Sequence, residues 1–522
     1  MALNLSRNTK VFVSSVNGVT SAGGNVVTVD AISGTNTNHA VGDILTFGTT
    51  SGSGTNFKCI VAAVSSGAVT EVYIPNNFRG SGYADNNTVT STASSGSGDN
   101  GLVLTINGVT DGNTAEGSRT GLGLFKGNET GANTFKIGVL DGYSFSQGSD
   151  ATDVTISEAG SSPNRGAKRF NDSLPPAEWS FSTYVRPYKH GTNSIRSSGT
   201  HDMVENILWA AIAGKNLTGA GSSDEASAIT VDSTDADVSF ARSDHHELLK
   251  LSIFFALENT TYRLNECQVN QVEVDFSIDG IATLNWSGNA TTIDQVTSAI
   301  EDPSKALHAK PSGTDTSTSV AAYIEEYSYV DVTGTDDADY LRNKLSTLTL
   351  SHATASDNTT LEVGGSGSAK SYDINITGGT LTIANNITYV TPETLGIVDK
   401  PIGSFTGSRQ ISGSLTMYLD TKSNGSNQLL TDLSAATSII TNEFDMSLFM
   451  GGGSSDTPVV EFDLPKAHLQ IPTIETADII STTVEFAGHG TDLLTGDEMT
   501  IKYKGSKSHS QAGYASSGSA AV

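Results

Sequence analysis

Side chains able to carry out acid–base, metal or nucleophilic chemistry are scattered along the chain, and none stands at a spacing that such chemistry requires. His245 and His246 are adjacent, so they cannot share a helix face, and no third ligand follows at a metal-binding spacing. Asp336, Asp337 and Asp339 lack the glycine and the terminal glutamate of a calcium loop. We therefore predict no metal site and no cofactor.

Two glycine-rich stretches are the other candidates for chemistry. GLGLFKG, at residues 121–127, misses the dinucleotide-binding spacing, and no βαβ pattern surrounds it. GGSGSA, at residues 364–369, lacks the strand–turn–helix context that a nucleophilic serine needs. Because no nucleophile–base set is present elsewhere, we predict no catalytic residue and disfavour a hydrolase.

Three aromatic residues, Trp179, Phe181 and Tyr184, raise the alternative of a platform for sugars or bases. On a strand, Trp179 and Phe181 share one face, whereas Tyr184 lies on the other. The favoured interpretation places Trp179 and Phe181 in the core, with Tyr184 facing elsewhere.

The composition indicates a polar, sheet-rich protein. The 522 residues include 54 glycines, and abundant serine, threonine and asparagine favour strands and turns over helices. With 29 Lys and Arg against 56 Asp and Glu, the formal net charge is −27. Such an acidic chain is poorly suited to grip DNA by its phosphates, although the charge also fits solubility alone.

The number of cysteines and the first residues of the sequence indicate the cellular compartment in which the protein is made. Cys59 and Cys267 are the two cysteines, which excludes a disulfide scaffold and a zinc site built mainly from cysteine. The first residues, MALNLSRNTKVFVSS, are too polar for a secretion signal. No apolar run approaches the ~18 residues of a membrane span. We expect synthesis in a cytoplasm.

Residues 16–133 differ from the rest of the chain. Short apolar runs, among them NVVTVDAI, DILTFG, KCIVAAV, AVTEVYI and LVLTI, are separated by turn signals such as Asn-Gly. The pattern predicts a compact all-β insert. Its ends should lie close together in space, because the strands before and after it belong to one module.

The remaining sequence contains an internal duplication. Residues 6–15 resemble 341–350, with Arg-Asn opening a strand in both. Further matches in the same order are 135–145 with 372–383, 152–160 with 385–394, 179–185 with 413–419, 251–257 with 446–452, and 281–291 with 481–491. The alignment pairs Tyr184 with Tyr418 and Trp286 with Phe486.

One helix is predicted at the same place in each copy. Apolar residues of 202–214 follow an i, i+3, i+4, i+7 pattern typical of a one-faced amphipathic helix, and 427–436 repeats it weakly. Each module is therefore expected to be two sheets or a barrel with a helix packed outside. The expected divisions are a first module (1–15 and 134–293), the insert (16–133), a linker (294–338), a second module (339–505) and a flexible Ser/Gly-rich tail (506–522).

At residues 161–189 the chain, with RGAKRFNDSLPPAEWSFSTYVRPYK, resembles the major tail tube proteins of T-five-like siphophages, which have long non-contractile tails. The likeness continues in order through DATDVTISEAG, CQVNQVEVDF, LNWSGNA, SYDINITGGTLTIANNITYVTP and IPTIETAD. It implies a mainly β chain that carries the tail-tube β-sandwich or barrel fold twice. It also implies pseudo-hexameric rings of three chains, stacked into the tube that carries the genome into the host.

By this resemblance, residues 161–176 form a long loop that contacts the adjacent ring, and 391–410 is its counterpart. The implied contact residues are Arg165, Lys168, Arg169, Asp172, Pro175 and Pro176, with Asp399, Lys400 and Arg409 in the counterpart. Prolines limit the entropy lost on docking, and the cations would meet an acidic copy of the same protein. The implied wall-strand residues, in the core or at an interface, are Trp179, Phe181, Tyr184, Tyr418, Trp286 and Phe486.

The resemblance also implies partners. These are other copies of the chain, the tape measure, terminator and distal tail proteins, and double-stranded DNA that passes without specific binding. Lumen-lining strands are expected near 153–160, 178–187, 385–391 and 411–419, with small polar or acidic side chains. The expected location is the virion tail, after synthesis in the bacterial host cytoplasm.

Two features depart from the family pattern. The insert at 16–133 has no counterpart, and a short tail stands where an immunoglobulin-like domain is expected. A glycan contact by the insert is one open interpretation. A terminator or baseplate ring of the same fold is a second, and a secreted β-rich adhesin, which would need a secretion signal, is a third.

Overall fold

The computed structural model shows a mainly β protein. It describes residues 8–14, 26–52, 54–74, 78–84, 86–109, 134–155, 167–191, 198–213, 229–240, 248–258, 260–296, 329–352, 370–391, 401–435, 444–471, 473–475, 480–492 and 496–509. His245, His246 and the stretches 121–127 and 364–369 lie outside these residues. Within them, no three His, Cys, Asp or Glu side chains are placed to hold a metal ion. No helix in the same residues is long and apolar enough to cross a membrane.

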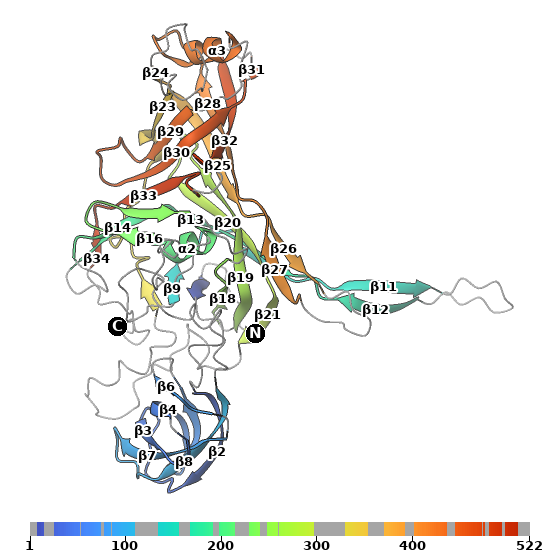
Figure 1. Cartoon of the computed structure of the whole chain (residues 1–522), viewed down its shortest axis with the longest axis vertical. Helices are drawn as coiled ribbons and strands as arrows, with labels where there is room; N and C mark the ends of the chain where they lie inside the picture. The colour runs from blue at the N-terminus through green and yellow to red at the C-terminus, as the bar shows by residue number, and fades with distance from the viewer. Residues whose placement is uncertain are drawn as a thin grey trace, which may run out of the picture.

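One long antiparallel sheet, here called the wall sheet, runs through both halves of the chain (Figure 1). Its strands are, in spatial order, β10 (Ser144–Ser146), β13 (Ala177–Tyr184), β20 (Thr283–Ala290), the second half of β19 (Thr260–Asp275), β25 (Ile376–Ala384), β28 (Gln410–Tyr418), β32 (Ser481–His489) and β30 (Val459–Leu469), which β31 (Thr473–Glu475) continues. Along β13, AEWSFSTY alternates buried and solvent-facing residues, as a strand buried on one face requires. The halves meet where β19 pairs with β25.

Further strands pack around each end of the wall sheet. In the first half these are β1 (Lys10–Ser14), β9 (Thr134–Ile137), β18 (Leu251–Leu257), β21 (Thr292–Val296) and β22 (Tyr329–Asp331). In the second half they are β23 (Thr347–His352), β24 (Lys370–Tyr372) and β29 (Phe444–Met450). A short 3₁₀ turn, η4 (Asn343–Leu345), precedes β23.

The C-terminal strands tie the halves together. β33 (Thr500–Lys504) pairs with β30 of the second half and with β17 (Ala236–Ser239) of the first, which β16 (Ile229–Val231) extends. β34 (Ser508–His509) pairs with β14 (Pro187–His190), next to β15 (His201–Met203). The expected flexible tail, 506–522, is therefore wrong for its first residues, and 510–522 lie outside the described residues.

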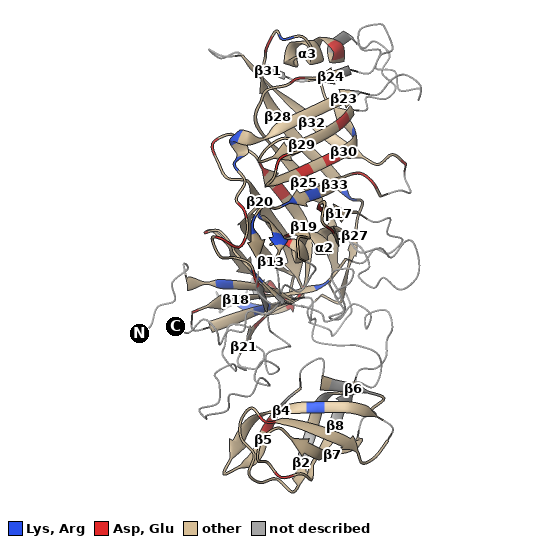
Figure 2. Ribbon diagram, turned by 90° about the vertical axis from the view of Figure 1, so that its left-hand side faces the viewer, with Lys and Arg blue, Asp and Glu red and all other residues tan. Residues whose placement is uncertain are grey.

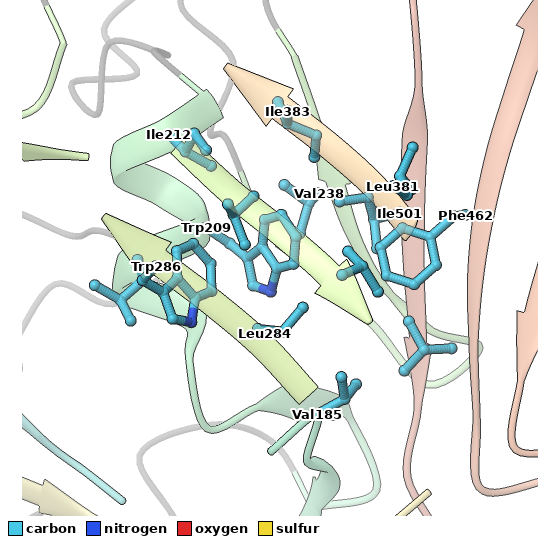
Figure 3. Packing of buried hydrophobic residues seen from close by; sticks show 14 of the residues in the cluster. Val185, Trp209, Ile212, Val238, Leu284, Trp286, Leu381, Ile383, Phe462 and Ile501 are labelled. Carbon is cyan, nitrogen blue, oxygen red and sulfur yellow. The ribbon is translucent and has the colours of Figure 1, made fainter. Parts of the chain in front are cut away.

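The two α-helices among the described residues are α2 (Asn206–Ala213) and α3 (Ser426–Ala435). α2 is shorter than the predicted helix over 202–214, and every one of its residues is buried, so the one-faced helix was wrong. NILWAAIA is apolar almost all round and suits burial on all sides. The Trp209 ring lies 5.0 Å from Trp286 and 6.5 Å from Phe462 of the second half (Figure 3), so the halves share one core.

The region predicted as an insert forms a separate seven-stranded sheet with its own core. Its strands are β2 (Val26–Gly34), β3 (Ile44–Thr49), β4 (Thr55–Ser65), β5 (Ala68–Tyr73), β6 (Arg79–Ser81), β7 (Thr88–Ser94) and β8 (Leu102–Val109). Ser14 and Thr134 lie directly opposite each other on β1 and β9. The expectation that the chain leaves and rejoins the first module at neighbouring points is confirmed.

Each half also carries a two-stranded hairpin. β11 (Asp150–Thr155) and β12 (Ala167–Ser173) form the first, which extends away from the wall sheet (Figure 1). β26 (Ile387–Val390) and β27 (Gly403–Thr406) form the second. The described parts of the expected lining segments 153–160 and 385–391 thus lie largely in hairpins rather than in the wall sheet.

The strand registers of the two halves agree with the predicted alignment. Phe12 of β1 lies opposite Phe254 of β18, and Thr347 of β23 lies opposite Phe449 of β29. The duplication in the sequence relates 12 to 347 and 254 to 449. The same strand pair therefore occurs in both halves with the same register.

Candidate assembly interfaces

The aromatic residues of β13 divide between the core and the other face of the sheet. Trp179 and Phe181 are buried, and their ring centroids lie 5.2 Å apart. Tyr184 points to the opposite face and packs edge-on against Tyr340, 5.5 Å away. Because two of the three rings are buried, β13 offers no aromatic platform for a sugar or a base.

The predicted correspondence of Trp286 with Phe486 is wrong by two residues. The strand partner of Tyr184 lies three residues before Trp286, whereas the strand partner of Tyr418 lies five residues before Phe486. Both aromatic side chains are nevertheless buried, because a shift of two residues keeps a side chain on the same face of a strand.

An exchange of aromatic and glycine between strands explains this shift. In the first half Trp179, on β13, covers Gly288 of β20, where a Cβ would lie 2.7 Å from the indole. In the second half Phe486, on β32, covers Gly413 of β28, where a Cβ would lie 2.5 Å from the ring. Each half thus packs one large ring over a glycine, but from opposite strands.

One face of the wall sheet is polar and carries few charges of either sign. The wall-sheet strands, counting β19 from its second half, carry the acids Glu178, Glu273, Asp275, Glu461, Asp463, Glu475 and Glu485, and Lys466 is their one Lys or Arg. Figure 2 shows β28 and β32 mostly uncharged. The other side chains of this face are mainly small hydroxyls and amides, including Ser180, Ser182, Asn285, Ser287, Thr380, Thr382, Ser412, Ser414, Thr416 and Thr483.

The β11–β12 hairpin carries three of the six expected stacking residues, Lys168, Arg169 and Asp172. Arg169 donates hydrogen bonds to both carboxylate oxygens of Asp153, at 2.7 and 2.9 Å, and this contact lowers the pKa of Asp153. The Lys168 ammonium lies 4.8 Å from the centroid of the exposed Phe170 ring. Asp172 accepts a hydrogen bond from β11. Lys168 and Arg169 are exposed, but Arg169 already has a partner within its own hairpin.

The base of this hairpin is tied to the wall sheet. The Gln147 amide donates to the carbonyl oxygens of Pro175, at 3.0 Å, and of Thr291, at 3.1 Å. Pro176 leads directly into β13. Arg165 lies outside the described residues.

The equivalent hairpin, β26–β27, lies against the first half of the chain. The Tyr389 hydroxyl donates to the carbonyl oxygen of Asn289 at 3.1 Å, and the Ile387 amide donates to Asn270 Oδ1 at 2.8 Å. A hydrogen bond between Ser404 and β19 adds to this contact. The hairpin of one module therefore packs on the neighbouring module.

Of the counterpart loop, Asp399 and Lys400 lie outside the described residues, and Arg409 makes an internal contact. Its Nη1 donates to Glu498 at 2.9 Å, and its guanidinium lies 4.7 Å from the Phe240 ring centroid. This cation is therefore used within the subunit.

The two strands that meet at the junction, β19 and β25, have counterparts at the two outer edges of the wall sheet: β31 corresponds to β19, and β10 corresponds to β25. Counting along strand partners from Tyr184 leads to Asp275 on β19, and counting from Tyr418 leads to Glu475 on β31. Similarly, β10 pairs with β13 as β25 pairs with β28. Among the described strands, none pairs with the outer edge of β10 or of β31.

Sequence reasoning missed a buried polar cluster beside α2. The Tyr503 hydroxyl donates to Glu205 Oε1 at 2.9 Å and accepts from the Trp209 indole at 2.8 Å. Burial raises the pKa of Glu205 to about 8. A single acid at the start of an otherwise apolar helix was the available signal.

Asp336, Asp337 and Asp339 hold the segment that leads into the C-terminal strand β34. Asp336 lies 3.1 Å from Lys507 Nζ, and Asp337 lies 3.2 Å from His509 Nδ1. Asp339 accepts a hydrogen bond from the Lys507 amide at 3.0 Å.

Comparison with known proteins agrees with this architecture. No family model matches the sequence. The chain is 37% identical over 370 residues to tail tube protein pb6 of Escherichia phage T5, a match that covers 70% of each chain. Identity at this level over most of both chains, together with the mainly β fold, establishes the family. The chain belongs to the phage tail tube proteins and is a structural component of a virion tail.

Proposed function

We propose that three copies of this chain close into a ring and that the rings stack into the tube through which the genome leaves the virion. The pairing of β19 with β25 carries this proposal. It joins two modules of similar fold inside one chain, and the outer strands β31 and β10 repeat its two sides. A head-to-tail contact that repeats with rotation closes into a ring, and closure removes the exposed sheet edges.

The internal junction predicts the register between chains. Asp275 lies opposite Thr380 at the junction, and the counterparts of this pair are Glu475 and Ser144. One turn of the pleat further along, Thr473 corresponds to Glu273, and Ser146 corresponds to Thr382. We therefore expect Thr473 of one copy opposite Ser146 of the next.

The polar face of the wall sheet is the proposed lumen lining. Hydroxyls and amides present no fixed positive charge to a phosphate, and the acids of the wall-sheet strands repel it. DNA would then pass without a strong binding site. The same ring would contact the tape measure protein inside, and terminator and distal tail proteins at its ends.

The β11–β12 hairpin is the proposed stacking element. Its sibling, β26–β27, already packs on a neighbouring module within the chain. The exposed side chains of Lys168 and Phe170, on β12, present a cation and an aromatic group to the subunits stacked above or below.

Electron microscopy of the purified full-length protein tests the assembly. We expect rings of three copies and tubes of stacked rings. Oxidising a mixture of the single variants Ser146→Cys and Thr473→Cys should link two chains, because opposed residues of antiparallel strands lie ~4.5–5.5 Å apart, within disulfide reach.

Neither variant alone should form this link, and the native Cys59 and Cys267 are buried. A protein that stays monomeric at high concentration would refute the ring. Rings that never elongate would favour a terminator or baseplate ring instead of a tube.

A further inference from the structure

The segment that enters the second module docks on the end of the first. The Leu341 carbonyl accepts a hydrogen bond from the Ala282 amide at 2.9 Å. The Asn343 amide donates to the Gly280 carbonyl at 3.0 Å, and its side chain donates to the Ser277 carbonyl at 2.8 Å. This segment therefore forms a short strand-like contact with the turn between β19 and β20.

The docked segment also covers an aromatic side chain. Tyr340 packs against Tyr184, with ring centroids 5.5 Å apart, and leaves Tyr184 half-buried. The Arg186 guanidinium lies 4.5 Å from the centroid of the same Tyr340 ring.

The equivalent end of the second module is uncovered. The Leu419 amide donates to the Ile480 carbonyl at 3.0 Å, as the Val185 amide donates to the Ala282 carbonyl at 3.0 Å. Ile480 therefore corresponds to Ala282, and Tyr418 corresponds to Tyr184. Ala282 is fully buried, whereas Tyr418 is 46% exposed and Ile480 is 44% exposed.

The chain contains a second copy of the docking sequence at its N-terminus. The registers of β1 on β18 and of β23 on β29 relate Phe12 to Thr347. Counting back by the same interval relates Asn8 to Asn343 and Arg7 to Arg342, so the Arg-Asn pair recurs in place. Asn8 has 3₁₀ geometry like Asn343, its counterpart, but Asn8 is exposed whereas Asn343 is buried.

The second copy cannot reach the uncovered surface of its own chain. β18, on which β1 lies, and β31, next to Ile480, are at distant parts of the molecule in both views (Figures 1 and 2). Within the chain, the docking segment (residues 340–343) belongs to the second module, whose strand β25 pairs with β19 of the first module. In a ring, the module beside β31 is the first module of the next copy.

We propose that residues 5–8 of one copy dock on the Tyr418–Ile480 surface of its neighbour in the ring. Residues 5–8 would then make between chains the contact that residues 340–343 make within the chain. Leu5 would cover Tyr418, as Tyr340 covers Tyr184. This inference rests on the proposed ring, and it identifies a second contact between the same two copies.

Cysteine pairing tests the docking. Leu341 lies opposite Ala282, so Ser6 of one copy should lie opposite Ile480 of the next. A mixture of the single variants Ser6→Cys and Ile480→Cys, oxidised after assembly, should give a covalent dimer on a non-reducing gel. Ser6→Cys mixed with Ile402→Cys is the matched control, because Ile402 is 73% exposed and lies near the β26–β27 hairpin.

The outcomes separate this proposal from the ring itself. If Ser146→Cys with Thr473→Cys links the chains but Ser6→Cys with Ile480→Cys does not, the docking is refuted and the ring stands. A Ser6→Cys/Ile480→Cys double variant that closes a disulfide within one chain also refutes it. If neither mixture forms a crosslink and no rings are seen, the proposed ring itself is refuted, and the docking with it.

Discussion

Glu205 is an ionisable residue buried in the core of this subunit. Its carboxyl is buried beside α2: Oε1 accepts a hydrogen bond from Tyr503, and Oε2 has no hydrogen-bond partner among the described residues. Burial raises its pKa to about 8, from an ordinary value of 4.5. A group whose pKa is raised on folding contributes its stability fully below the unfolded value, and this contribution falls as pH rises to the folded value.

We therefore predict that the subunit loses stability between about pH 4.5 and pH 8 through this group. Glu205→Gln keeps an oxygen for the Tyr503 hydroxyl but cannot ionise. Its melting temperature should exceed that of the wild type at pH 8, by roughly 1 °C for each kcal/mol gained in a unit of this size. Thermal melts from pH 4.5 to pH 9 measure the difference.

Tyr503→Phe is the matched variant for this prediction. The Tyr503 hydroxyl holds the pKa of Glu205 down, so its removal should extend the loss of stability to higher pH. Parallel pH profiles for Glu205→Gln and the wild type would contradict the assignment.

At the scale of the element, the β11–β12 hairpin combines an internal ion pair with exposed groups free to meet a neighbour. Arg169 and Asp153 are both exposed, so solvent screens their pairing and it contributes little to folding. The hairpin extends from the wall sheet on a base held by Gln147. A rigid base and an exposed end suit an element that acts between copies.

Arg169→Glu should leave the subunit folded, with little change in its stability, because solvent screens the exposed pair. It should shorten the tubes, because it places a second acid next to Asp153 on the face that we propose meets an acidic neighbour. Tube length by electron microscopy and melting temperature are the two measurements.

The charge-swapped variant Asp153→Arg/Arg169→Glu separates the two roles of the pair. It restores an ion pair within the hairpin but reverses the charges presented by β11 and β12. We expect its tubes to stay short. Tubes of normal length would show that only the internal pair matters.

At the scale of the whole molecule, the insert is separable from the modules that build the wall. It has its own sheet and its own core, and the chain leaves and returns at two residues that already face each other, Ser14 and Thr134. The domain boundaries remain a proposal, and this hairpin geometry supports the one at the insert.

Replacing residues 15–133 by Asn-Gly should therefore leave a two-residue hairpin between β1 and β9, a loop that these residues favour. We expect a folded subunit that forms tubes of unchanged lumen and smaller outer diameter. An insoluble product, or rings without the lumen of the wild type, would show that the insert supports the wall.

The sequence predicted individual strands well because their signals are local. The runs NVVTVDAI, DILTFG and LVLTI each became a strand of the insert, and the recurring Arg-Asn placed β1 and β23 in register. It predicted side-chain partners poorly, because partners are set by three-dimensional packing. Arg169 and Arg409 looked like free cations, and both bind acids of the same chain.

By itself, then, the sequence determined the mainly β class, the duplication and the insert, since these depend on patterns that repeat along the chain. The tertiary structure alone decided that β19 pairs with β25, that α2 is buried on every side, and that Tyr184 is covered while Tyr418 is not. Each of these depends on which distant segments meet. Contacts between residues more than a hundred positions apart leave no local periodicity to read, so only the folded chain reveals them.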